Sequence, residues 1–319
     1  MNKNVKIYIA GHRGLAGSAI ARELQRHGYT NIVTRTHAEL DLEDAVATRK
    51  FFEQERPEIV FLAAAKVGGI HANNTYPVDF LMSNLLIEAN ICRAAHANNA
   101  ARLIFLGSSC IYPRDCPQPI KEEYLLTGPL EATNRPYALA KIAGIEMCWS
   151  YNRQYGTKWL AAMPTNLYGP GDNYDLNNSH VLPALIRKMH EAKMVDAKEV
   201  VLWGSGTPKR EFLYVNDLAN ALIFLATLNA QRYDALVEPS YCPLINVGSG
   251  EDLTIRELAE TIAEVVGYQG RFVQDTSKPD GTMRKVMDVS KIRNLGWSPR
   301  INLREGIALA YNNFLKSTM

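Results

Sequence analysis

A strand, a glycine-rich turn and a helix follow one another near the start of the chain, and this order constrains the fold more than any other feature. Residues 5–10 (VKIYIA) read as a buried strand, and residues 11–17 (GHRGLAG) carry glycine at every third position before a helix that we expect to end near Gly28. The first glycine permits a tight bend, the second lets a phosphate approach the backbone, and the third lets helix and strand pack closely. Free N–H groups at the helix N-terminus favour a diphosphate. The turn therefore predicts dinucleotide binding.

Strands and helices alternate from this turn to about residue 170. The apolar runs that we expect to be strands are residues 31–34, 58–62, 103–106 and 159–163. Long helices are expected at residues 77–98 and 136–155. The alternation predicts an α/β fold of the Rossmann type, a doubly wound parallel sheet with helices on both faces. We expect this domain to cover residues 1–170, with segments near 212–248 returning to it, and a smaller, partly interleaved α/β substrate lobe over residues 171–319.

Loops and helix ends are expected at specific points. Residues 66–74 are rich in small and amide residues and are expected to form a loop, either at a substrate pocket or on the surface. The prolines at both ends of residues 164–170 are expected to stop regular structure. Asn216 with Asp217, and later Thr254, are expected to cap the helices that follow them.

A serine, a tyrosine and a lysine lie in the order that a proton-transfer site needs. Ser108 follows the strand at residues 103–106, and Tyr137 and Lys141 lie four apart on the next helix, which Pro136 suits as first residue. An ammonium favours tyrosinate and lowers the phenol pKa, and Ser and Tyr together can hold a carbonyl oxygen. The pair alone is also common on solvated helix faces. Its position after a nucleotide-binding turn and Ser108 favours catalysis.

The residues around the second strand favour NADP over NAD. An NAD site often carries an acidic residue here that binds the ribose 2′-OH. This chain has Arg35 instead, and Arg13 in the glycine turn. Two guanidinium groups suit a 2′-phosphate, although both arginines are also compatible with plain surface positions. Asp41 is expected either to contact the adenine side or to start the helix from about Asp44.

The composition argues against several classes of protein. The 319 residues include 35 basic and 33 acidic ones, and the net charge of +2 without a basic run argues against a nucleic-acid partner. Five widely spaced cysteines without a Cys-x-x-Cys motif argue against a disulfide framework or a metal site and favour a reducing compartment. No apolar run reaches membrane-spanning length. The first strand begins near Val5, so we expect a cytoplasmic protein without a signal peptide.

The longer motifs resemble the extended short-chain dehydrogenase/reductases that act on nucleotide sugars. The glycine turn and the Tyr-x-x-x-Lys pattern within PYALAKIAGIEMC are typical of the broad family, whereas AAAKVGGI, GSSCIYP and NSHVLPAL are much narrower. Further matching stretches, MPTNLYGPGDNY, WGSGTPKREFLYVNDLA and KPDGT, extend the resemblance over nearly the whole chain. The narrow motifs resemble the members that epimerise C3 and C5 of GDP-4-keto-6-deoxy-D-mannose and then reduce C4. The resemblance implies these activities, NADP(H) as cofactor and a homodimer built on the two long helices.

The resemblance also implies roles for single residues. Cys110 is the implied base and His180 the implied acid of epimerisation, although by themselves they would be read as a buried thiol and a capping or core histidine. Tyr137 is the implied proton donor to the C4 oxygen and Ser108 orients that oxygen. Lys141 is expected to hold the ribose and to lower the pKa of Tyr137.

The remaining implied contacts belong to the cofactor and to the GDP moiety. The cofactor contacts are Gly11, His12, Arg13, Gly14, Leu15, Ala16, Gly17, Arg35, Asp41, Leu42, Ala64, Leu106, Gly107, Lys141, Pro164, Asn166, Leu167 and His180. The GDP contacts are Lys188, Trp203, Arg210 and Asp280. Cations suit a diphosphate and an indole can cover a ring face.

Several alternatives stay open at this point. Arg187 could replace Lys188, and Cys116 is the alternative base, whereas Cys92, Cys148 and Cys242 are expected to be structural. His37 stands where an arginine would strengthen the 2′-phosphate site.

Other functions are also compatible with the fold. A nucleotide-sugar 4-epimerase or 4,6-dehydratase would keep its NAD bound and show no net redox. Dehydratases need a carboxylate pair just after the serine, where this chain has Ser109 and Cys110. A non-catalytic NADP-binding regulator would typically lack the Tyr–Lys pair.

Overall fold

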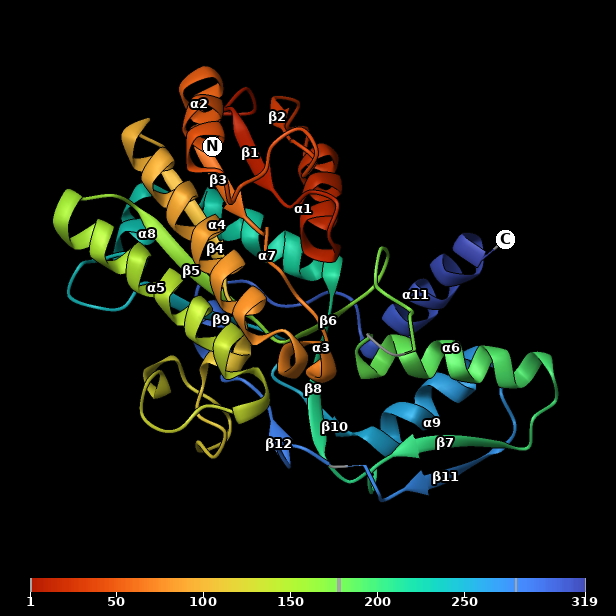
Figure 1. The fold of residues 1–319 in the computed structure, drawn as a ribbon. Coiled ribbons are helices and arrows are strands. Elements are labelled where there is room, and N and C mark those ends of the chain that lie inside the picture. Colours follow the sequence, from red (N-terminus) through yellow and green to blue (C-terminus); the bar gives the residue numbers. More distant parts are fainter. Residues whose placement is uncertain (1, 177–178, 279, 319) are drawn as a thin grey trace.

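A parallel sheet of six strands organises the larger part of the computed structural model, which describes residues 2–176, 179–278 and 280–318 (Figure 1). The strands lie in the order β2–β1–β3–β4–β5–β9, and every neighbouring pair is parallel. Their bounds are β1 Ile7–Ala10, β2 Ile32–Val33, β3 Ile59–Leu62, β4 Arg102–Leu106, β5 Trp159–Pro164 and β9 Leu244–Val247. The predicted doubly wound α/β fold is confirmed.

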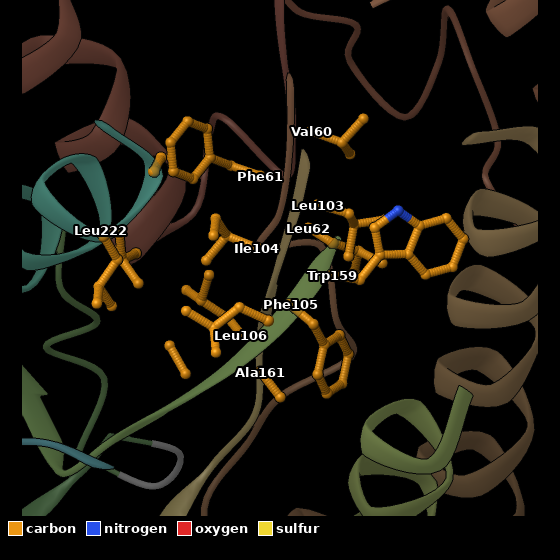
Figure 2. Close-up of a cluster of buried hydrophobic side chains, with 14 of the residues drawn as sticks. Val60, Phe61, Leu62, Leu103, Ile104, Phe105, Leu106, Trp159, Ala161 and Leu222 are labelled. Atoms are coloured by element: carbon orange, nitrogen blue, oxygen red, sulfur yellow. The ribbon is translucent and has the colours of Figure 1, made fainter. Parts of the chain in front are cut away.

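Apolar side chains leave this sheet on both faces. Figure 2 shows Phe61 and Ile104 on the side of Leu222, whereas Val60 and Trp159 lie on the opposite side. All residues of β3 and β5 are buried. Continuous apolar runs are typical of parallel strands that helices cover on both faces, so the core explains why these strands were recognisable in the sequence.

Two groups of helices cover the sheet. On one side α1 packs against α7, and on the other α4 packs against both α5 and α2. Their bounds are α1 Leu15–Arg26, α2 Ala45–Glu55, α4 Pro77–Ala97, α5 Arg135–Tyr155 and α7 Val215–Thr227. Asp44 caps α2 by accepting from the N–H groups of Val46 and Ala47. The α4–α5 pair carries the catalytic candidates Tyr137 and Lys141.

A second, smaller core lies beside the sheet (Figure 1). Its central strand β8 pairs with β10 in antiparallel fashion and with β12 and β6 in parallel, while β7 pairs with β11. The strands are β6 Asn166–Tyr168, β7 Glu199–Trp203, β8 Lys209–Tyr214, β10 Asp252–Thr254, β11 Arg271–Asp275 and β12 Arg284–Lys285. The principal helices here are α6 Val181–Met194, α9 Ile255–Val266 and α11 Leu303–Thr318. The predicted cap of Thr254 on α9 is confirmed as a capping box with Glu257.

Short helices connect these elements. They are α3 Ile70–Thr75, α8 Ala230–Leu236, α10 Ser290–Asn294 and the 3₁₀ turns η1 Ser109–Ile111, η2 Glu122–Tyr124 and η3 Ala132–Asn134. The turn η1 directly follows Ser108 and contacts α5. It therefore brings the end of β4 next to the helix that carries Tyr137.

The crevice expected for a dinucleotide lies between β1 and β3. The chain leaves β1 towards β2 on one side, and β3 lies on the other side of β1, which makes this the point where the strand order reverses. Ligands of open α/β sheets bind at such a point, outside the carboxyl ends of the strands. Gly11 follows β1 there, and a Cβ atom on it would lie 2.7 Å from the Cα atom of Ala64. The turn and the end of β3 are therefore in close contact.

Several local predictions were wrong. The expected loop at residues 66–74 contains the start of α3, and the expected irregular segment 164–170 contains β6. Helix α7 begins at Val215, so Asn216 and Asp217 lie in its first turn and do not cap it. Asp217 instead accepts hydrogen bonds from the N–H groups of Arg300 and Ile301. Helix α5 begins one residue before Pro136.

The predicted domain boundary near residue 170 stays a prediction. Strand β9 joins the large sheet, although it follows several strands of the smaller lobe in the chain, and β6 pairs with β8 across the expected boundary.

Among the described residues, no helix combines the length and apolarity that crossing a membrane requires. The same residues include no group of three or more His, Cys, Asp or Glu side chains suited to a metal ion.

Candidate active site

The glycine turn leaves the N-terminus of α1 open. A Cβ atom on Gly17 would lie 2.1 Å from the carbonyl oxygen of Gly11, so helix and turn can approach this closely only with glycine. The N-cap residue Gly14 offers no side-chain cap, and the first turn of α1 holds no acidic residue. Uncapped N–H groups and the positive end of the helix dipole suit a phosphate. These residues therefore fit the diphosphate of a dinucleotide.

Two arginines face the same carboxylate beyond β2. The N–H and hydroxyl of Thr36, followed by the guanidinium groups of Arg35 and Arg13, hold the pKa of Glu39 below its usual value. Arg35 also forms an ion pair with Glu55, with 2.6 Å between Arg35 Nη2 and Glu55 Oε1. Both predicted arginines therefore lie near the same carboxylate, that of Glu39. Their contact with a 2′-phosphate stays a prediction.

Asp41 has a local structural role beyond β2. Its Oδ1 atom accepts a hydrogen bond from the N–H of Glu43 at 2.9 Å and lies 3.8 Å from His37 Nδ1. Asp44, three residues further on, is the cap of α2. Asp41 therefore stabilises the turn before α2 and does not start this helix, which Asp44 caps. Its contact with adenine stays a prediction.

Some of the remaining predicted cofactor residues lie at the carboxyl ends of strands. Leu106 ends β4, Gly107 follows it, and Pro164 ends β5. Asn166 lies in β6 and its amide donates to the carbonyl oxygen of Glu211 at 2.8 Å. Further members of this set are His12, Leu15, Ala16, Leu42, Ala64 and Leu167. Cofactors of this fold bind outside these strand ends, so the positions are consistent with the proposed contacts.

Ser108, Cys110 and Tyr137 come together where β4 ends. Ser108 Oγ accepts a hydrogen bond from the N–H of Cys110 at 3.4 Å. The Ser108 side chain also hydrogen-bonds to Tyr137 and opposes the rise in the phenol pKa. Burial raises the pKa of Tyr137 well above its usual value, and the potentials of Cys110 and Glu88 raise it further. A hydroxyl, a thiol and a protonated phenol therefore form one cluster.

The expectation that the pKa of Tyr137 is lowered was wrong for this structure. Lys141 Nζ lies 3.1 Å from Glu88 Oε1 and 5.9 Å from the centre of the Tyr137 ring. Because the carboxylate lies close to the ammonium, it offsets the positive potential that would otherwise favour tyrosinate. Burial is the largest cause of the raised pKa of Tyr137, and Cys110 and Glu88 add to it.

Cys110 is a buried thiol with a cation in its surroundings. The residue is 7% exposed, and burial raises the pKa of its thiol. The ammonium of Lys285 is the largest opposing influence, ahead of Ser108 and Lys141. Lys285 lies on β12, next to Arg210 in the ladder with β8. A thiolate needs such a neighbouring cation to act as a base.

The other cysteines differ from Cys110 in their surroundings. Cys92 on α4 and Cys148 on α5 are buried between the two helices, and burial raises the pKa of each thiol. Cys116 is half-buried, and burial raises the pKa of its thiol. Lys285 lowers this pKa, but by less than burial raises it. Burial raises the pKa of Cys242 to about 12. All five cysteines are free thiols.

His180 lies on a separate element. It is the N-cap residue of α6, and its side chain makes no cap hydrogen bond. Although more than a third of its surface is exposed, the protein around the ring removes water from it and lowers its pKa. Among the described residues, no hydrogen bond or ion pair joins its side chain to Ser108 or Tyr137. Its role as acid stays a prediction.

The four residues predicted for GDP lie together in the smaller lobe. Lys188 Nζ lies 5.0 Å from the centre of the Trp203 ring. Asp280 Oδ1 accepts a hydrogen bond from the N–H of Ser205 at 2.7 Å, and the Asp280 carboxylate partly offsets the lowering that burial causes in the pKa of Arg210. Cations beside an exposed indole suit a nucleoside diphosphate.

Two further basic residues near this group, an arginine and a lysine, differ in their contacts. Arg187, the alternative to Lys188, pairs with Glu191 at 2.7 Å and donates to the carbonyl oxygen of Tyr174. Lys278 Nζ lies 5.5 Å from the Trp203 ring and was missed from the sequence. A second cation therefore accompanies Lys188 at the indole.

Sequence reasoning also missed Glu88 and Lys285. Glu88 interrupts the apolar run LLIEANI on α4, and a charged residue is rarely buried without a partner. That interruption was an available signal. Lys285 lies in a short strand among other charged residues, RK in β12, and the sequence holds no comparable signal for it.

The fold and this arrangement define a class of dinucleotide-dependent enzyme. The model of the NAD dependent epimerase/dehydratase family matches residues 7–236, and the chain belongs to this family. Among individual proteins, it is 55% identical to a GDP-L-fucose synthase from Escherichia coli, over 98% of this chain and 97% of that protein. It is also 55% identical to GDP-L-fucose synthase 1 from Arabidopsis thaliana, over 99% of this chain and 95% of the relative.

A solved structure supports the same assignment. MlghC, described as a GDP-mannoheptose C4 reductase from Campylobacter jejuni with NADP bound, superposes with a TM-score of 0.91. It is 41% identical in sequence, and the match covers 99% of each chain. The predicted resemblance to the nucleotide-sugar dehydrogenase/reductases is confirmed at the level of the family.

Proposed function

We propose that this protein is an NADPH-dependent epimerase/reductase that converts GDP-4-keto-6-deoxy-D-mannose to GDP-L-fucose. The observation that carries the proposal is the cluster of Ser108, Cys110 and Tyr137 at the end of β4. A phenol and a hydroxyl suit the reduction of a ketone, and a thiol beside them suits proton abstraction next to that ketone. The 55% identity to GDP-L-fucose synthase over nearly the full chain supports the choice of substrate.

Epimerisation follows from the chemistry of the C4 ketone. The hydrogens on C3 and C5 are α to the carbonyl and therefore acidic. Cys110 removes each proton as thiolate, which Lys285 favours, and His180 returns a proton to the opposite face. The lowered pKa of His180 makes its protonated form the stronger acid.

Reduction then takes place at C4. Ser108 orients the carbonyl oxygen, and Tyr137 donates its proton to that oxygen as the alkoxide forms. When bound, NADPH supplies the hydride, so one ketone gains a hydride and a proton and becomes an alcohol. The glycine turn at residues 11–17 holds the diphosphate, and Arg13 and Arg35 hold the 2′-phosphate.

The smaller lobe binds the GDP moiety. Lys188 and Arg210 interact with the diphosphate, while Trp203 covers a ring face and Asp280 accepts from hydroxyl or base N–H groups. Burial lowers the pKa of Lys188, and an anionic ligand would reverse that shift. Two lobes therefore supply cofactor and substrate contacts on either side of the reacting sugar.

We also propose that the protein is a cytoplasmic homodimer. Five free cysteines suit a reducing compartment. Several apolar side chains on α4 and α5 are exposed in the single chain, among them Val78, Met82, Leu86, Leu139 and Tyr155. An isologous contact between copies of these helices would bury them.

The product of one reaction tests the function. Purified protein is incubated with GDP-4-keto-6-deoxy-D-mannose and NADPH in deuterated buffer. We expect one NADPH oxidised for each sugar reduced, and solvent deuterium at C3 and C5 of the product. Tightly bound NAD and sugar conversion without net redox would instead identify a 4-epimerase or dehydratase.

A further inference from the structure

A carboxylate is enclosed in the helix packing directly beside the catalytic lysine. Glu88 lies in the middle of α4 and is 0% exposed, and Lys141 on α5 is 1% exposed. Glu88 Oε1 lies 3.1 Å from Lys141 Nζ, and this ammonium is the only described partner of the carboxylate. A buried charge is costly unless it is paired. The family mechanism described above does not use Glu88.

The packing around the pair makes room for the carboxylate. A Cβ atom on Gly144 would lie 2.8 Å from Glu88 Oε2 and 2.3 Å from Cζ of Phe105, so a larger residue at this position of α5 would displace both. Lys141 Nζ also lies 4.7 Å from the centre of the Phe105 ring. The ammonium is therefore fixed between a carboxylate, an aromatic face and the Tyr137 ring.

We propose that Glu88 is a positioning residue for the reductive step, which holds Lys141 beside Tyr137 and offsets its charge so that the phenol stays protonated. The inference rests on the proposed function, in which Tyr137 donates a proton to the sugar oxygen. An ammonium without a counter-ion favours tyrosinate, which is a base and suits the oxidation of an alcohol. A lysine–glutamate ion pair carries no net charge and therefore favours the protonated phenol, which suits the reduction of a ketone.

The charges that face the two groups agree with this role. Burial raises the pKa of Glu88 to about 6 against the opposing influence of Lys141, so the carboxylate is ionised at neutral pH. Besides Lys141 and Tyr137, the titratable groups that interact with Glu88 include Cys92 on α4 and Cys148 on α5. Their thiol pKa values are raised, so both stay neutral near pH 7. Glu88 and Lys141 therefore form an ion pair between two neutral thiols in this packing.

The groups that face Tyr137 lie on three elements. Cys110 on η1 and Glu88 on α4 raise the phenol pKa, and the Ser108 side chain lowers it. Lys141 Nζ, on the same helix as Tyr137, lies 5.9 Å from the centre of its ring. Of these, Glu88 can lose its charge by substitution without a change in any group proposed to touch the substrate.

The test is the titration of Tyr137 in the isosteric variant Glu88→Gln. The phenolate is followed by ultraviolet difference spectra, E88Q minus E88Q/Y137F, and compared with wild type minus Y137F. We expect the phenolate of E88Q to form about one to three pH units lower, because a neighbouring charge shifts a pKa by that amount. The pH above which the reduction rate falls should decrease by the same amount. At pH 7, the rate of alcohol oxidation by NADP⁺ should rise relative to the rate of ketone reduction.

Glu23→Gln is the matched control. Glu23 is 4% exposed and pairs with Arg26 at 2.9 Å on α1. Removing this buried carboxylate should leave the Tyr137 titration unmoved. A shift as large as in E88Q would overturn the inference, since it would not depend on the position of Glu88.

The outcomes also separate this inference from the proposed function. An unmoved titration in folded E88Q overturns the role of Glu88, even where the sugar is turned over. A shifted titration in a protein that does not oxidise NADPH supports the electrostatic role and overturns the function. If E88Q does not fold, Glu88→Asp withdraws the carboxylate from Lys141; a smaller shift in the same direction is expected, and no shift overturns the role.

Discussion

Arg35 is held in place by Glu55, with 2.6 Å between Arg35 Nη2 and Glu55 Oε1. Its Nη1 atom also donates to the carbonyl oxygen of Thr34 at 2.8 Å, and the guanidinium lies over the Phe51 ring. One contact from Thr34, which follows β2, and two from α2 therefore fix this group independently of any ligand. A fixed guanidinium loses less entropy when it binds a phosphate.

Replacement of Arg35 should therefore weaken NADPH more than NADH. We expect Arg35→Ala to lower kcat/KM for NADPH by about 10- to 100-fold, the range of one charge-assisted hydrogen bond, and to leave that for NADH nearly unchanged. Arg35→Lys, the control that keeps the charge, should lose less. Steady-state kinetics with both cofactors decide the point, and an equal loss with both would exclude a contact to the 2′-phosphate.

Substitutions at Cys110 and Lys285 should separate epimerisation from reduction. Cys110→Ser should lose solvent deuterium uptake at C3 and C5 first. Lys285→Met should raise the thiol pKa further, because it removes the largest influence that lowers it. The thiolate is the basic form, so the rising limb of deuterium uptake should move to higher pH in this variant. Normal uptake in Cys110→Ser would show that another residue, with Cys116 the nearest alternative, is the base.

The fold was predictable where local signals carry it. The glycine turn, the buried strands and the cap Thr254 depend on turn chemistry and on apolar runs that a sequence shows directly. Strand β6 was not recognisable, because a short strand between prolines lacks a periodic pattern of its own. It forms by pairing with β8, with Asn166 opposite Phe212. A distant partner decided its conformation.

The candidate site shows the same division. The motifs predicted Ser108 and Tyr137, which the structure brings together. The direction of the Tyr137 pKa shift was not predictable, because its largest cause is burial of the phenol in the folded chain. Glu88, which also raises this pKa, reaches Lys141 only through the packing of α4 on α5. The spacing of Tyr137 and Lys141 places two residues on one helical face, but it says nothing about the charge that lies opposite them.

Two glycines of the turn should differ in their tolerance of alanine. A Cβ atom on Gly17 would lie 2.1 Å from the Gly11 carbonyl oxygen, whereas one on Gly14 would lie 3.4 Å from the same atom. We expect Gly17→Ala to lower the free energy of unfolding by about 1–3 kcal/mol, the range of forced overpacking, and Gly14→Ala to change it much less. Urea unfolding without cofactor measures the free energy of unfolding of the protein alone, without a contribution from cofactor binding. Equal stabilities of the two variants would contradict the close approach of α1 to the turn.

Asp172 should make the protein less stable as the pH rises. Its Oδ1 atom accepts from the N–H of Asn173 at 2.8 Å, but Oδ2 is buried without a partner among the described residues. Burial raises its pKa from 3.8 to about 7. The folded state therefore binds more protons than the unfolded state between these values, and this carboxyl lowers the free energy of unfolding as the pH rises through that window.

Asp172→Asn removes this dependence. Urea unfolding at pH 8 should show the variant more stable than wild type by about 1–2 kcal/mol, after allowance for the partial exposure of the side chain, with the difference vanishing near pH 4. Asp44→Asn is the control of opposite sign: the N–H groups of Ala47 and Val46 lower the pKa of Asp44, so its contribution is present above the unfolded pKa and is lost as the pH falls. A pH-independent difference for Asp172→Asn would mean that this carboxyl stays solvated in the folded protein.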